Sequence, residues 1–429
     1  MIGLHVTTMG CKLNQLDSAE LAGALRGTAA AVDDPARARL IVINTCSVTG
    51  TAESDARQLM RRRRRENPEA VIVATGCYAE RDPAALAAMG GVDVILSRAQ
   101  RRRAASIILE ELRRRFPEEL ADGCITRDVE ASLPAFGDRT RAFLRVQDGC
   151  GLRCSYCIIP AVRGCSVSVP PEQVERQLRT LLAAGYREVV LTGVNSGDYG
   201  KDLHPRLSLA DLLARLLGVE GRFRLRLNSL EPRCVDAGIT GLMAAQPRLA
   251  RHLQVPLQSG SDRVLAAMRR NYRAADYARI IGALRSACPD AGIGADVIVG
   301  FPGETEADFA RTQDLILAAG LNYLHVFPWS ARPGTTAAGM PGRVAATVVR
   351  ERCASLRMLG RQLALRFRRS QEGSVQEALV MRGRHEDGRM RALTSNYIEV
   401  ALMDDAEENS LVRVRIECAD DDITLARVT

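Results

Sequence analysis

The chain has 429 residues, of which 46% are hydrophobic and 4% aromatic, and its formal net charge is +8. This length allows two or three domains with buried cores, and the aliphatic content excludes a disordered chain. The sequence contains no uninterrupted run of about 18 to 20 apolar residues that could cross a membrane, and its N-terminus lacks the pattern of a signal peptide. We therefore expect a cytoplasmic globular protein, not a membrane protein, whose twelve cysteines serve as metal ligands, catalytic groups or buried apolar residues rather than in disulfides.

The first region alternates apolar segments with helical ones. Strands are expected in LHVTTMGC, LIVINTC and AVIVATGC, with helices near residues 18–25 and 53–65. This alternation predicts a parallel α/β sheet within residues 1–132. Each predicted strand ends at a cysteine: Cys11, Cys46 and Cys77. Because the carboxyl ends of parallel strands share one edge, where ligands bind, we expect the three thiols to converge; the alternative is three small buried residues.

The second region, residues 139–368, follows a predicted linker at residues 133–139. Its predicted strands alternate with helical segments and are AFLRVQ, EVVLTG, FRLRLNS, HLQVPLQ, GADVIVG and YLHVFPW. Six strand-helix units predict a partial (β/α)6 barrel rather than a closed barrel of eight. The segments after these strands are polar or glycine-rich, and barrel active sites are built from such segments.

A cysteine array lies directly after the first of these strands. Cys150, Cys154 and Cys157 are spaced as C-x3-C-x2-C within DGCGLRCSYCIIP. Structural metal sites normally have four protein ligands, and the only nearby fourth candidate is Cys165. If Cys165 is not used, one metal position stays open to bind and activate another molecule.

The third region, residues 370–429, contains five short predicted strands and suggests a small β-barrel. It holds seven arginines against thirteen acidic residues, a net charge of −6, so the rest of the chain carries +14. Arginine runs at residues 61–65, 101–103 and 113–115 either contact nucleic-acid phosphates or form solvated helix faces. Since 57 of the 59 cations are arginines, composition alone explains such runs equally well.

The C-x3-C-x2-C array with Tyr156 before its last cysteine resembles the radical S-adenosylmethionine (SAM) enzymes. In that superfamily the three thiolates hold a 4Fe-4S cluster, and its free iron binds SAM. Further stretches across nearly the whole chain resemble the methylthiotransferases: GCKLNQLDS, VINTCSV, TGCYAE, CSYCIIPAVRG, LTGVNSGDYG, VPLQSGSDRVLAAMRRNY, DVIVGFPGET and SARPGTTAA. PAFGDRTRAFLRVQDGC and LHVFPWSARPGT look most like the branch that acts on N6-threonylcarbamoyladenosine next to the anticodon of tRNA.

The resemblance implies an N-terminal cluster domain, a radical SAM domain and a C-terminal TRAM barrel. It assigns one 4Fe-4S cluster and the catalytic role to Cys150, Cys154 and Cys157. A second 4Fe-4S cluster is implied on Cys11, Cys46 and Cys77. The implied chemistry is abstraction of the C2 hydrogen of the adenine by a 5′-deoxyadenosyl radical, followed by transfer of a methylated sulfur. The implied partners are a tRNA substrate and a reduced flavodoxin- or ferredoxin-type electron donor, and nothing in the sequence requires more than a monomer.

The resemblance also assigns SAM contacts, each with a structural alternative. The implied contacts are Tyr156, Gly193, Asn195, Ser229, Glu231, Gln258 and Asp296. Alternatively, Tyr156 is a loop aromatic, Gly193 only turns the chain, and Glu231 is an exposed glutamate. Gln258, Asp296 and Arg332 lie at strand ends and could instead form structural pairs or turns. Asn14 is expected beside Cys11 as a hydrogen-bond donor to the cluster.

Competing functions stay open at this point. The acidic last region leaves a protein substrate possible, as in related enzymes that methylthiolate a ribosomal-protein aspartate, and another modified adenosine is also possible. A different class is a non-catalytic iron-sulfur or zinc protein that binds RNA, which predicts no SAM cleavage after reduction.

Overall fold

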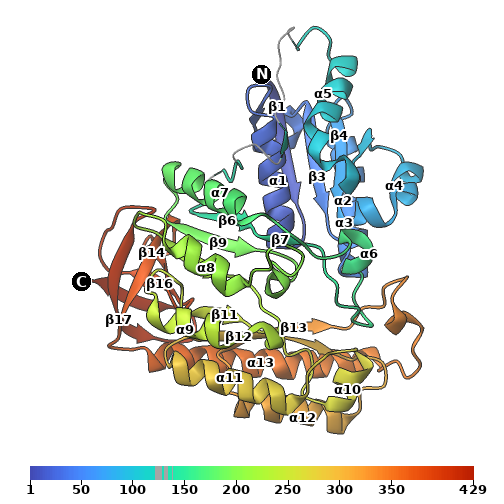
Figure 1. The fold of residues 1–429 in the computed structure, drawn as a ribbon. Helices are drawn as coiled ribbons and strands as arrows, with labels where there is room; N and C mark the ends of the chain where they lie inside the picture. Colours follow the sequence, from blue (N-terminus) through green and yellow to red (C-terminus); the bar gives the residue numbers. More distant parts are fainter. Residues whose placement is uncertain (121–127, 130–133, 138) are drawn as a thin grey trace.

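Three parts follow one another along the chain. The computed structural model describes residues 1–120, 128–129, 134–137 and 139–429. Figure 1 shows a helix-flanked parallel sheet above an open arrangement of strands and helices, with a small C-terminal barrel beside the latter. The expected α/β fold class is confirmed. The predicted linker at 133–139 is described only in part and the boundary at 132 lies outside the described residues, so the domain limits at 132, 139 and 368 stay predictions.

The N-terminal sheet is parallel throughout, in the strand order β2-β1-β3-β4-β5. The three predicted strands form its centre, and the short edge strands β2 and β5 were missed because they have only three and two residues. Every residue of β3 is buried, as expected for a central strand covered on both faces. The strands are β1 (Ile2–Thr8), β2 (Ala29–Ala31), β3 (Leu40–Thr45), β4 (Val71–Gly76) and β5 (Val94–Ile95).

Helices cover both faces of this sheet (Figure 1). They are α1 (Lys12–Ala24), α2 (Gly50–Glu66), α3 (Cys77–Arg81), α4 (Pro83–Met89), α5 (Ala104–Arg115) and the 3-10 helices Pro35–Arg37 and Arg98–Arg103. The predicted start of the first helix at residue 18 is wrong. Ser18 lies buried inside the helix, where its hydroxyl accepts hydrogen bonds from Thr8 Oγ1 (2.7 Å) and Asn44 Nδ2 (3.0 Å). The helix instead begins directly after Cys11.

The middle part contains the six predicted strands in two three-stranded parallel sheets, β10-β9-β6 and β11-β12-β13. Isolated bridges from Leu225 to Leu249 and from Ser229 to Gln254 join the two sheets, which gives the expected open six-stranded barrel. The strands are β6 (Arg141–Arg145), β9 (Glu188–Thr192), β10 (Arg224–Leu227), β11 (His252–Gln254), β12 (Gly292–Val299) and β13 (Tyr323–Pro328).

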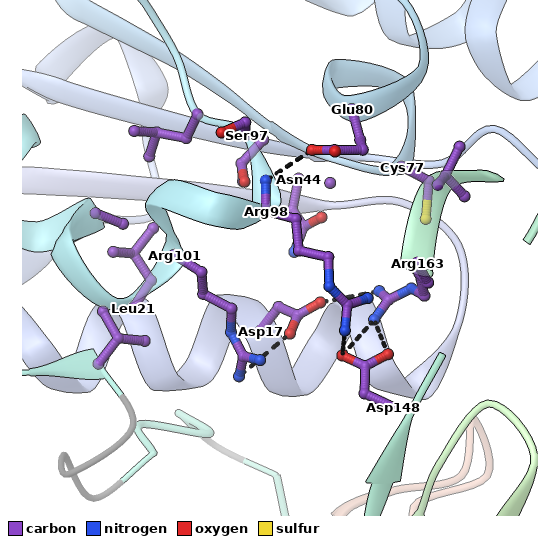
Figure 2. A pocket seen from close by; sticks show the side chains of 16 residues that line it. Asp17, Leu21, Asn44, Cys77, Glu80, Ser97, Arg98, Arg101, Asp148 and Arg163 are labelled. Carbon is purple, nitrogen blue, oxygen red and sulfur yellow. Dashed lines mark hydrogen bonds and ion pairs between the residues drawn. The ribbon is translucent and has the colours of Figure 1, made fainter. Parts of the chain in front are cut away.

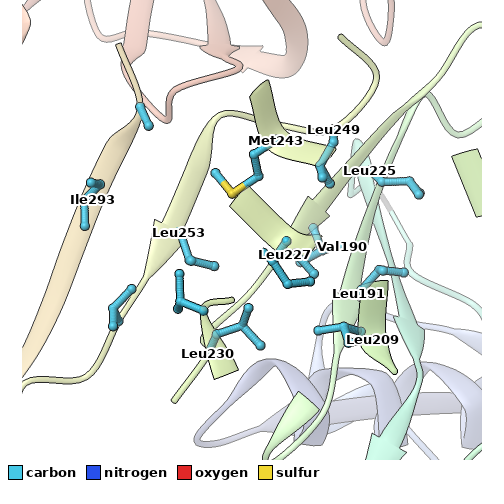
Figure 3. Close-up of a cluster of buried hydrophobic side chains, with 14 of the residues drawn as sticks. Val190, Leu191, Leu209, Leu225, Leu227, Leu230, Met243, Leu249, Leu253 and Ile293 are labelled. Atoms are coloured by element: carbon cyan, nitrogen blue, oxygen red, sulfur yellow. The ribbon is translucent and has the colours of Figure 1, made fainter. Parts of the chain in front are cut away.

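Helices on the outside of this barrel complete its core. They are α7 (Pro171–Ala183), α8 (Leu209–Leu217), α9 (Ala237–Ala245), α10 (Asp262–Ala267), α11 (Ala274–Ala287), α12 (Glu306–Ala318) and α13 (Ala346–Ser370); 3-10 turns cover Ser196–Asp198, Pro232–Cys234 and Thr336–Gly339, and β7 (Gln147–Asp148) pairs with β8 (Val167–Ser168). The short helix α6 (Ile159–Arg163) packs instead against α3 of the N-terminal part (Figure 1). Figure 3 shows leucine, valine and methionine side chains from strands and helices meeting in this core. Leu13 and Leu16 of α1 belong to the same cluster, so the first helix packs against the barrel as well as its own sheet.

The C-terminal part is a closed barrel in the order β14-β15-β16-β18-β17, as predicted. Its strands are β14 (Val375–Arg384), β15 (Met390–Thr394), β16 (Glu399–Leu402), β17 (Leu411–Ala419) and β18 (Thr424–Val428). Two arginines of β10 attach it: Arg224 Nη2 donates to Leu393 O (2.8 Å), and Arg226 Nη1 donates to Ser395 O (3.0 Å). The fully buried Glu188 pairs with both arginines at 2.6 and 2.9 Å and offsets one of their two positive charges.

Among the described residues, no helix is both long and apolar enough to cross a membrane.

Candidate active site

The parallel sheet brings the three distant cysteines together, as predicted. Cys11 comes shortly after β1, Cys46 directly follows β3, and Cys77 directly follows β4. The register pairs Thr8 with Asn44 and Thr45 with Gly76, so these three strands end level with one another. Cys11 Sγ and Cys77 Sγ both lie near the same atom, Asn14 Oδ1, at 3.8 and 4.0 Å. We call Cys11, Cys46 and Cys77 the strand-edge triad.

Glycines leave room for this triad. Gly10 has φ +92°, and a Cβ on it would lie 2.9 Å from Cys46 Cβ and 3.0 Å from Cys46 Sγ. Gly76 has φ +90°, and a Cβ there would lie 2.3 Å from Asn44 Oδ1. Side chains at either position would collide with the triad or its support, so the chain needs glycine at both turns.

The second triad is held by its own loop. Cys150, Cys154 and Cys157 form the loop triad, in the segment after β7. Ser155 anchors the segment through three hydrogen bonds: its N donates to Met268 O (3.0 Å), its Oγ donates to Ala267 O (2.7 Å), and its O accepts from Ala337 N (2.7 Å). These bonds hold the loop, at the residue next to Tyr156, against the end of α10 and the 3-10 turn Thr336–Gly339.

Cys165 lies close to this loop through its backbone. A Cβ on Gly149 would lie 1.9 Å from Cys165 O, and Cys150 N donates to Gly164 O at 3.0 Å. The side chain of Cys165 is exposed. The observed contact of Cys165 with the loop is thus a backbone contact.

Burial favours the protonated thiol at four of the six cysteines of the two triads when they hold no metal. Burial raises the pKa of Cys77 and Cys150 to about 11 and that of Cys157 to about 12, and it also raises the pKa of Cys46. These thiols therefore differ from nucleophilic cysteines, whose thiolates are stabilised by their surroundings. Metal coordination is the chemistry that would stabilise them as thiolates.

A buried ion pair lies against the loop triad. Arg270 is 3% exposed, pairs with Glu231, and places Nη1 3.3 Å from Cys154 Sγ. Burial raises the pKa of Glu231, while the charge of Arg270 acts in the opposite direction. Glu231 is therefore not the exposed glutamate of the structural alternative, and a paired carboxylate and guanidinium lie beside a predicted ligand, Cys154.

The loop after β9 is bound to the loop triad through Gln147. Gln147 Oε1 accepts from Asn195 N (2.9 Å), and its Nε2 donates to Gly149 O (2.6 Å). A Cβ on Gly193 would lie 2.9 Å from Gln147 Oε1, which explains the glycine as a close approach. Asn195 Oδ1 and Ser196 Oγ are buried without a hydrogen-bond partner in the described part of the chain. Such atoms normally have partners, so they suit a ligand with polar groups.

A cavity of about 230 Å³ lies beside the loop triad and the residues that follow Cys46. Four of the predicted site residues line it: Tyr156 and Cys157 from the loop that carries the loop triad, Gln258 from the segment after β11, and Asp296 from β12. Asp296 lies inside β12 (Gly292–Val299), so its predicted position at the end of a strand is wrong. Val48 and Thr49, which follow Cys46, form another wall, and Trp329 closes it after β13. The cavity thus touches the loop triad directly and the strand-edge triad through its neighbouring residues.

The remaining predicted residues take different positions. Gln258 has a left-handed backbone (φ 62°), and its N donates to Asp296 O at 2.8 Å. Asp296 Oδ1 accepts from Gln254 Nε2 (2.8 Å). Ser229 contacts β11 through its backbone bridge to Gln254 and does not line the cavity. Strained backbone at Gln258 fits a position held in place for function.

Arg332 takes the structural role that the sequence left open. It is 3% exposed and pairs with Glu53 of α2, and its Nη2 donates to Ser47 Oγ (3.2 Å), next to Cys46. The loop after β13 is therefore fastened to the strand-edge triad from across the cavity.

The donor sets fit iron-sulfur clusters. Each triad offers three sulfur atoms, one fewer than a closed metal site requires, and a cluster with one open iron needs three. Among the described residues, no three Cys, His, Asp or Glu side chains converge closely enough to hold one metal ion. A 4Fe-4S cluster has no such requirement, because its thiolates bind different irons.

Three important residues were missed by the sequence analysis: Gln147, Arg163 and Arg270. Arg163 lies in CSYCIIPAVRG and Arg270 in LAAMRRNY, so both stand inside stretches that were already singled out. In a chain with 57 arginines, however, an arginine in a motif gives little signal. The two arginines are identified by their burial and by their position beside a cysteine, and only the structure shows these two properties.

Comparison with known proteins agrees with this site. Residues 144–316 match the radical SAM superfamily, and residues 3–97 match the uncharacterized protein family UPF0004. In solved structures, the radical SAM methyltransferase TsrM from Kitasatospora setae has a similar fold, with a TM-score of 0.56 and 15% identity over 79% of this chain and 75% of that one. The fold and the loop triad together define a radical SAM enzyme.

Whole-chain relatives narrow the class further. The threonylcarbamoyladenosine tRNA methylthiotransferase MtaB of Bacillus subtilis is 37% identical, covering 92% of this chain and 89% of the relative. MtaB of Aquifex aeolicus is 34% identical, covering 95% and 98%. The tRNA-2-methylthio-N(6)-dimethylallyladenosine synthase of Acidothermus cellulolyticus is 35% identical, covering 96% and 82%. The chain belongs to the radical SAM methylthiotransferase family.

Proposed function

We propose that this enzyme adds a methylthio group to C2 of N6-threonylcarbamoyladenosine in tRNA. The observation that carries the proposal is the 230 Å³ cavity, which is lined by Cys157 of the loop triad and by Val48 and Thr49 beside Cys46. A methylthiotransferase must bring a hydrogen-abstracting centre and a sulfur donor to one carbon, and this cavity borders both the loop triad and the residues next to Cys46. The relatives named for threonylcarbamoyladenosine support this choice of base.

The two triads have separate roles in this proposal. Cys150, Cys154 and Cys157 would hold one 4Fe-4S cluster, and Cys11, Cys46 and Cys77 would hold the other. When bound, the first cluster with SAM supplies a 5′-deoxyadenosyl radical and the second supplies the sulfur. The protein's own contribution is to hold the base between Tyr156 and Trp329 and to exclude water from the cavity.

Charged and unpartnered groups beside the loop triad support a SAM site there. The amino acid end of SAM carries a carboxylate and an ammonium, which complement Arg270 and Glu231. Asn195 Oδ1 would accept a hydrogen bond from a polar group of SAM, and Ser196 Oγ would donate or accept one. Tyr156, Gly193, Ser229, Gln258 and Asp296 are proposed as further contacts or as walls of the same site.

The partners follow from the proposed reaction. We propose a tRNA substrate, a flavodoxin- or ferredoxin-type electron donor and a monomeric enzyme acting in the cytoplasm. The arginine runs are partly engaged within the protein: Arg64 pairs with Asp93 at 2.5 Å and Arg114 with Glu111 at 2.5 Å. Phosphate contact would fall to arginines without such partners, such as the exposed Arg61 of α2.

A comparison of three substrates in separate reactions tests the proposal. The reconstituted enzyme would receive SAM, a reductant and three substrates in parallel: tRNA with threonylcarbamoyladenosine, tRNA with dimethylallyladenosine, and ribosomal protein. Mass spectrometry of the digests should find the methylthio group in the first sample. A product only in the second would reassign the base, and a product only in the third would overturn the tRNA proposal. SAM cleavage without any methylthio product in all three would contradict the function itself.

A further inference from the structure

One buried arginine connects the two triads. Arg163 ends α6, six residues after Cys157 of the loop triad, and is 6% exposed. Its guanidinium reaches α1 of the other sheet, where Nη2 donates to Asn14 Oδ1 (2.6 Å) and to Asp17 Oδ2 (2.9 Å). Figure 2 shows it beside the sulfur of Cys77, on the wall of a cavity of about 60 Å³.

Asn14 cannot donate to the strand-edge triad as the sequence suggested. Both hydrogens of its amide are used, because Nδ2 donates to Met9 O (2.8 Å) and to Thr45 O (2.9 Å). These two carbonyls fix which end of the amide is nitrogen, so the oxygen faces Cys11 Sγ and Cys77 Sγ. An amide oxygen accepts hydrogen bonds from thiols, but it offers nothing to thiolates.

Arg163 supplies the donor that Asn14 lacks. Arg163 and Cys77 line the same small cavity, and Figure 2 shows the guanidinium of Arg163 near the sulfur of Cys77. A guanidinium in this position can donate to a thiolate and attract its negative charge. The two segments also pack through apolar contacts, since Cys77 packs with Ile158 and Val162. The residue that stabilises a thiolate at the sheet edge therefore comes from the other half of the molecule.

The neighbouring arginines are paired with carboxylates. Arg101 pairs with Glu20, and Arg98 pairs with Asp148 at 3.2 Å. Arg145 pairs with Asp17 (2.6 Å), Glu20 (2.9 Å) and Asp148 (3.1 Å), two of which are also partners of Arg163. Arg145 and Arg163 thus share Asp17 and Asp148, while Arg163 also lies near the sulfur of Cys77.

We propose that Arg163 is a positioning residue for the strand-edge cluster, holding it by charge and hydrogen bond from the segment that carries the loop triad. This inference rests on the proposed cluster at Cys11, Cys46 and Cys77. A fixed positive charge beside a cluster favours its more negative, reduced form and so raises its reduction potential. Arg163 also links the two triads through one five-residue helix, so the spacing of the two centres depends on it.

The test measures the potential of the strand-edge cluster alone. Full-length protein whose loop triad is changed to Ala would carry Arg163→Gln, Arg163→Lys or Arg145→Gln, the last as the matched control. Each variant would be reconstituted anaerobically and titrated with a reductant while the electron paramagnetic resonance signal is followed. Iron content and thermal unfolding would be recorded on the same samples.

Removing the charge of Arg163 should lower the potential or the cluster occupancy, and Arg163→Lys should recover a large part of either loss. Arg145→Gln should reduce thermal stability to a similar degree while potential and occupancy remain close to those of the parent. Equal losses in Arg163→Gln and Arg145→Gln would overturn the proposal, because the carboxylate network alone would then account for them. An unchanged potential with full occupancy in Arg163→Gln would overturn it too. Neither result depends on which substrate the enzyme modifies, so the failure of the proposed function remains distinguishable.

Discussion

The two cysteine triads present the same three ligands by different means. The strand-edge triad draws Cys11, Cys46 and Cys77 from three strands, and its members are separated by more than thirty residues. The sheet ladder fixes their positions, because β1, β3 and β4 are paired in a level register. The loop triad lies within eight residues, and its geometry depends on local anchors such as Ser155.

The difference predicts how each triad responds to change. A ladder of backbone hydrogen bonds forms with the fold, so the strand-edge triad should exist before any metal binds. A loop held by a few bonds has more freedom, so the loop triad should depend more on its anchors and on its cluster. The two sites should therefore be separable by substitutions near one of them.

Single ligand substitutions should have the largest effects. Cys46→Ala should abolish the methylthio product but leave SAM cleavage to 5′-deoxyadenosine, because the loop triad stays intact. Cys154→Ala should abolish both. Chromatography of 5′-deoxyadenosine and of the modified nucleoside checks this, with the exposed Cys418→Ala as a control. Loss of SAM cleavage in Cys46→Ala would show that the triads do not act independently.

Gly10→Ala should come next in size. The new Cβ would lie 3.0 Å from Cys46 Sγ, in a backbone conformation with φ +92°. We expect the iron of the strand-edge site to be lost and the protein to be destabilised by about 1–3 kcal/mol. Gly27→Ala is the matched control, because Gly27 has the same φ and a Cβ added to it would meet no other atom within 4 Å. Iron analysis and thermal unfolding of both variants would check this prediction. Equal iron loss in the two variants would contradict the claim that a collision with Cys46 displaces the iron.

Ser155→Ala should weaken only the loop triad. It removes the bond from Ser155 Oγ to Ala267 O, which contributes about 0.5–1.5 kcal/mol. If that energy holds the loop in its reactive geometry, the SAM cleavage rate should fall about two- to tenfold. Ser370→Ala removes a similar bond at the end of α13 and should leave the rate unchanged. A change in strand-edge iron in Ser155→Ala would contradict the separation of the sites.

Trp329→Phe should have the smallest effect. Trp329 Nε1 is buried without a hydrogen-bond partner among the described residues, and its ring lines the cavity. If the substrate accepts this hydrogen bond, the KM for tRNA should rise about two- to tenfold. SAM cleavage without tRNA and thermal stability should not decrease, because the free protein loses no bond. An unchanged KM would place the base elsewhere in the cavity.

The periodicity of hydrophobic residues predicted the fold, and the positions of the cysteines predicted both triads. The six barrel strands and the five strands of the closed barrel were readable from apolar runs, and the cysteines at strand ends predicted their own convergence. The start of α1 at Lys12 was missed because its N-cap, Cys11, makes no side-chain capping bond and so gives no start signal in the sequence. The partner of Arg332 was unreadable because Glu53 lies 279 residues away and the pairing depends on how the barrel packs on the sheet. The role of Arg163 likewise depends on long-range packing.

The most direct test of two separate cluster sites is the iron and sulfide content after anaerobic reconstitution. The wild type should hold about eight irons per chain, and changing either triad to Ala should leave about four. About four irons in the wild type, falling to none without the loop triad and unchanged without the strand-edge triad, would contradict the account, because the strand-edge cysteines would then hold no cluster.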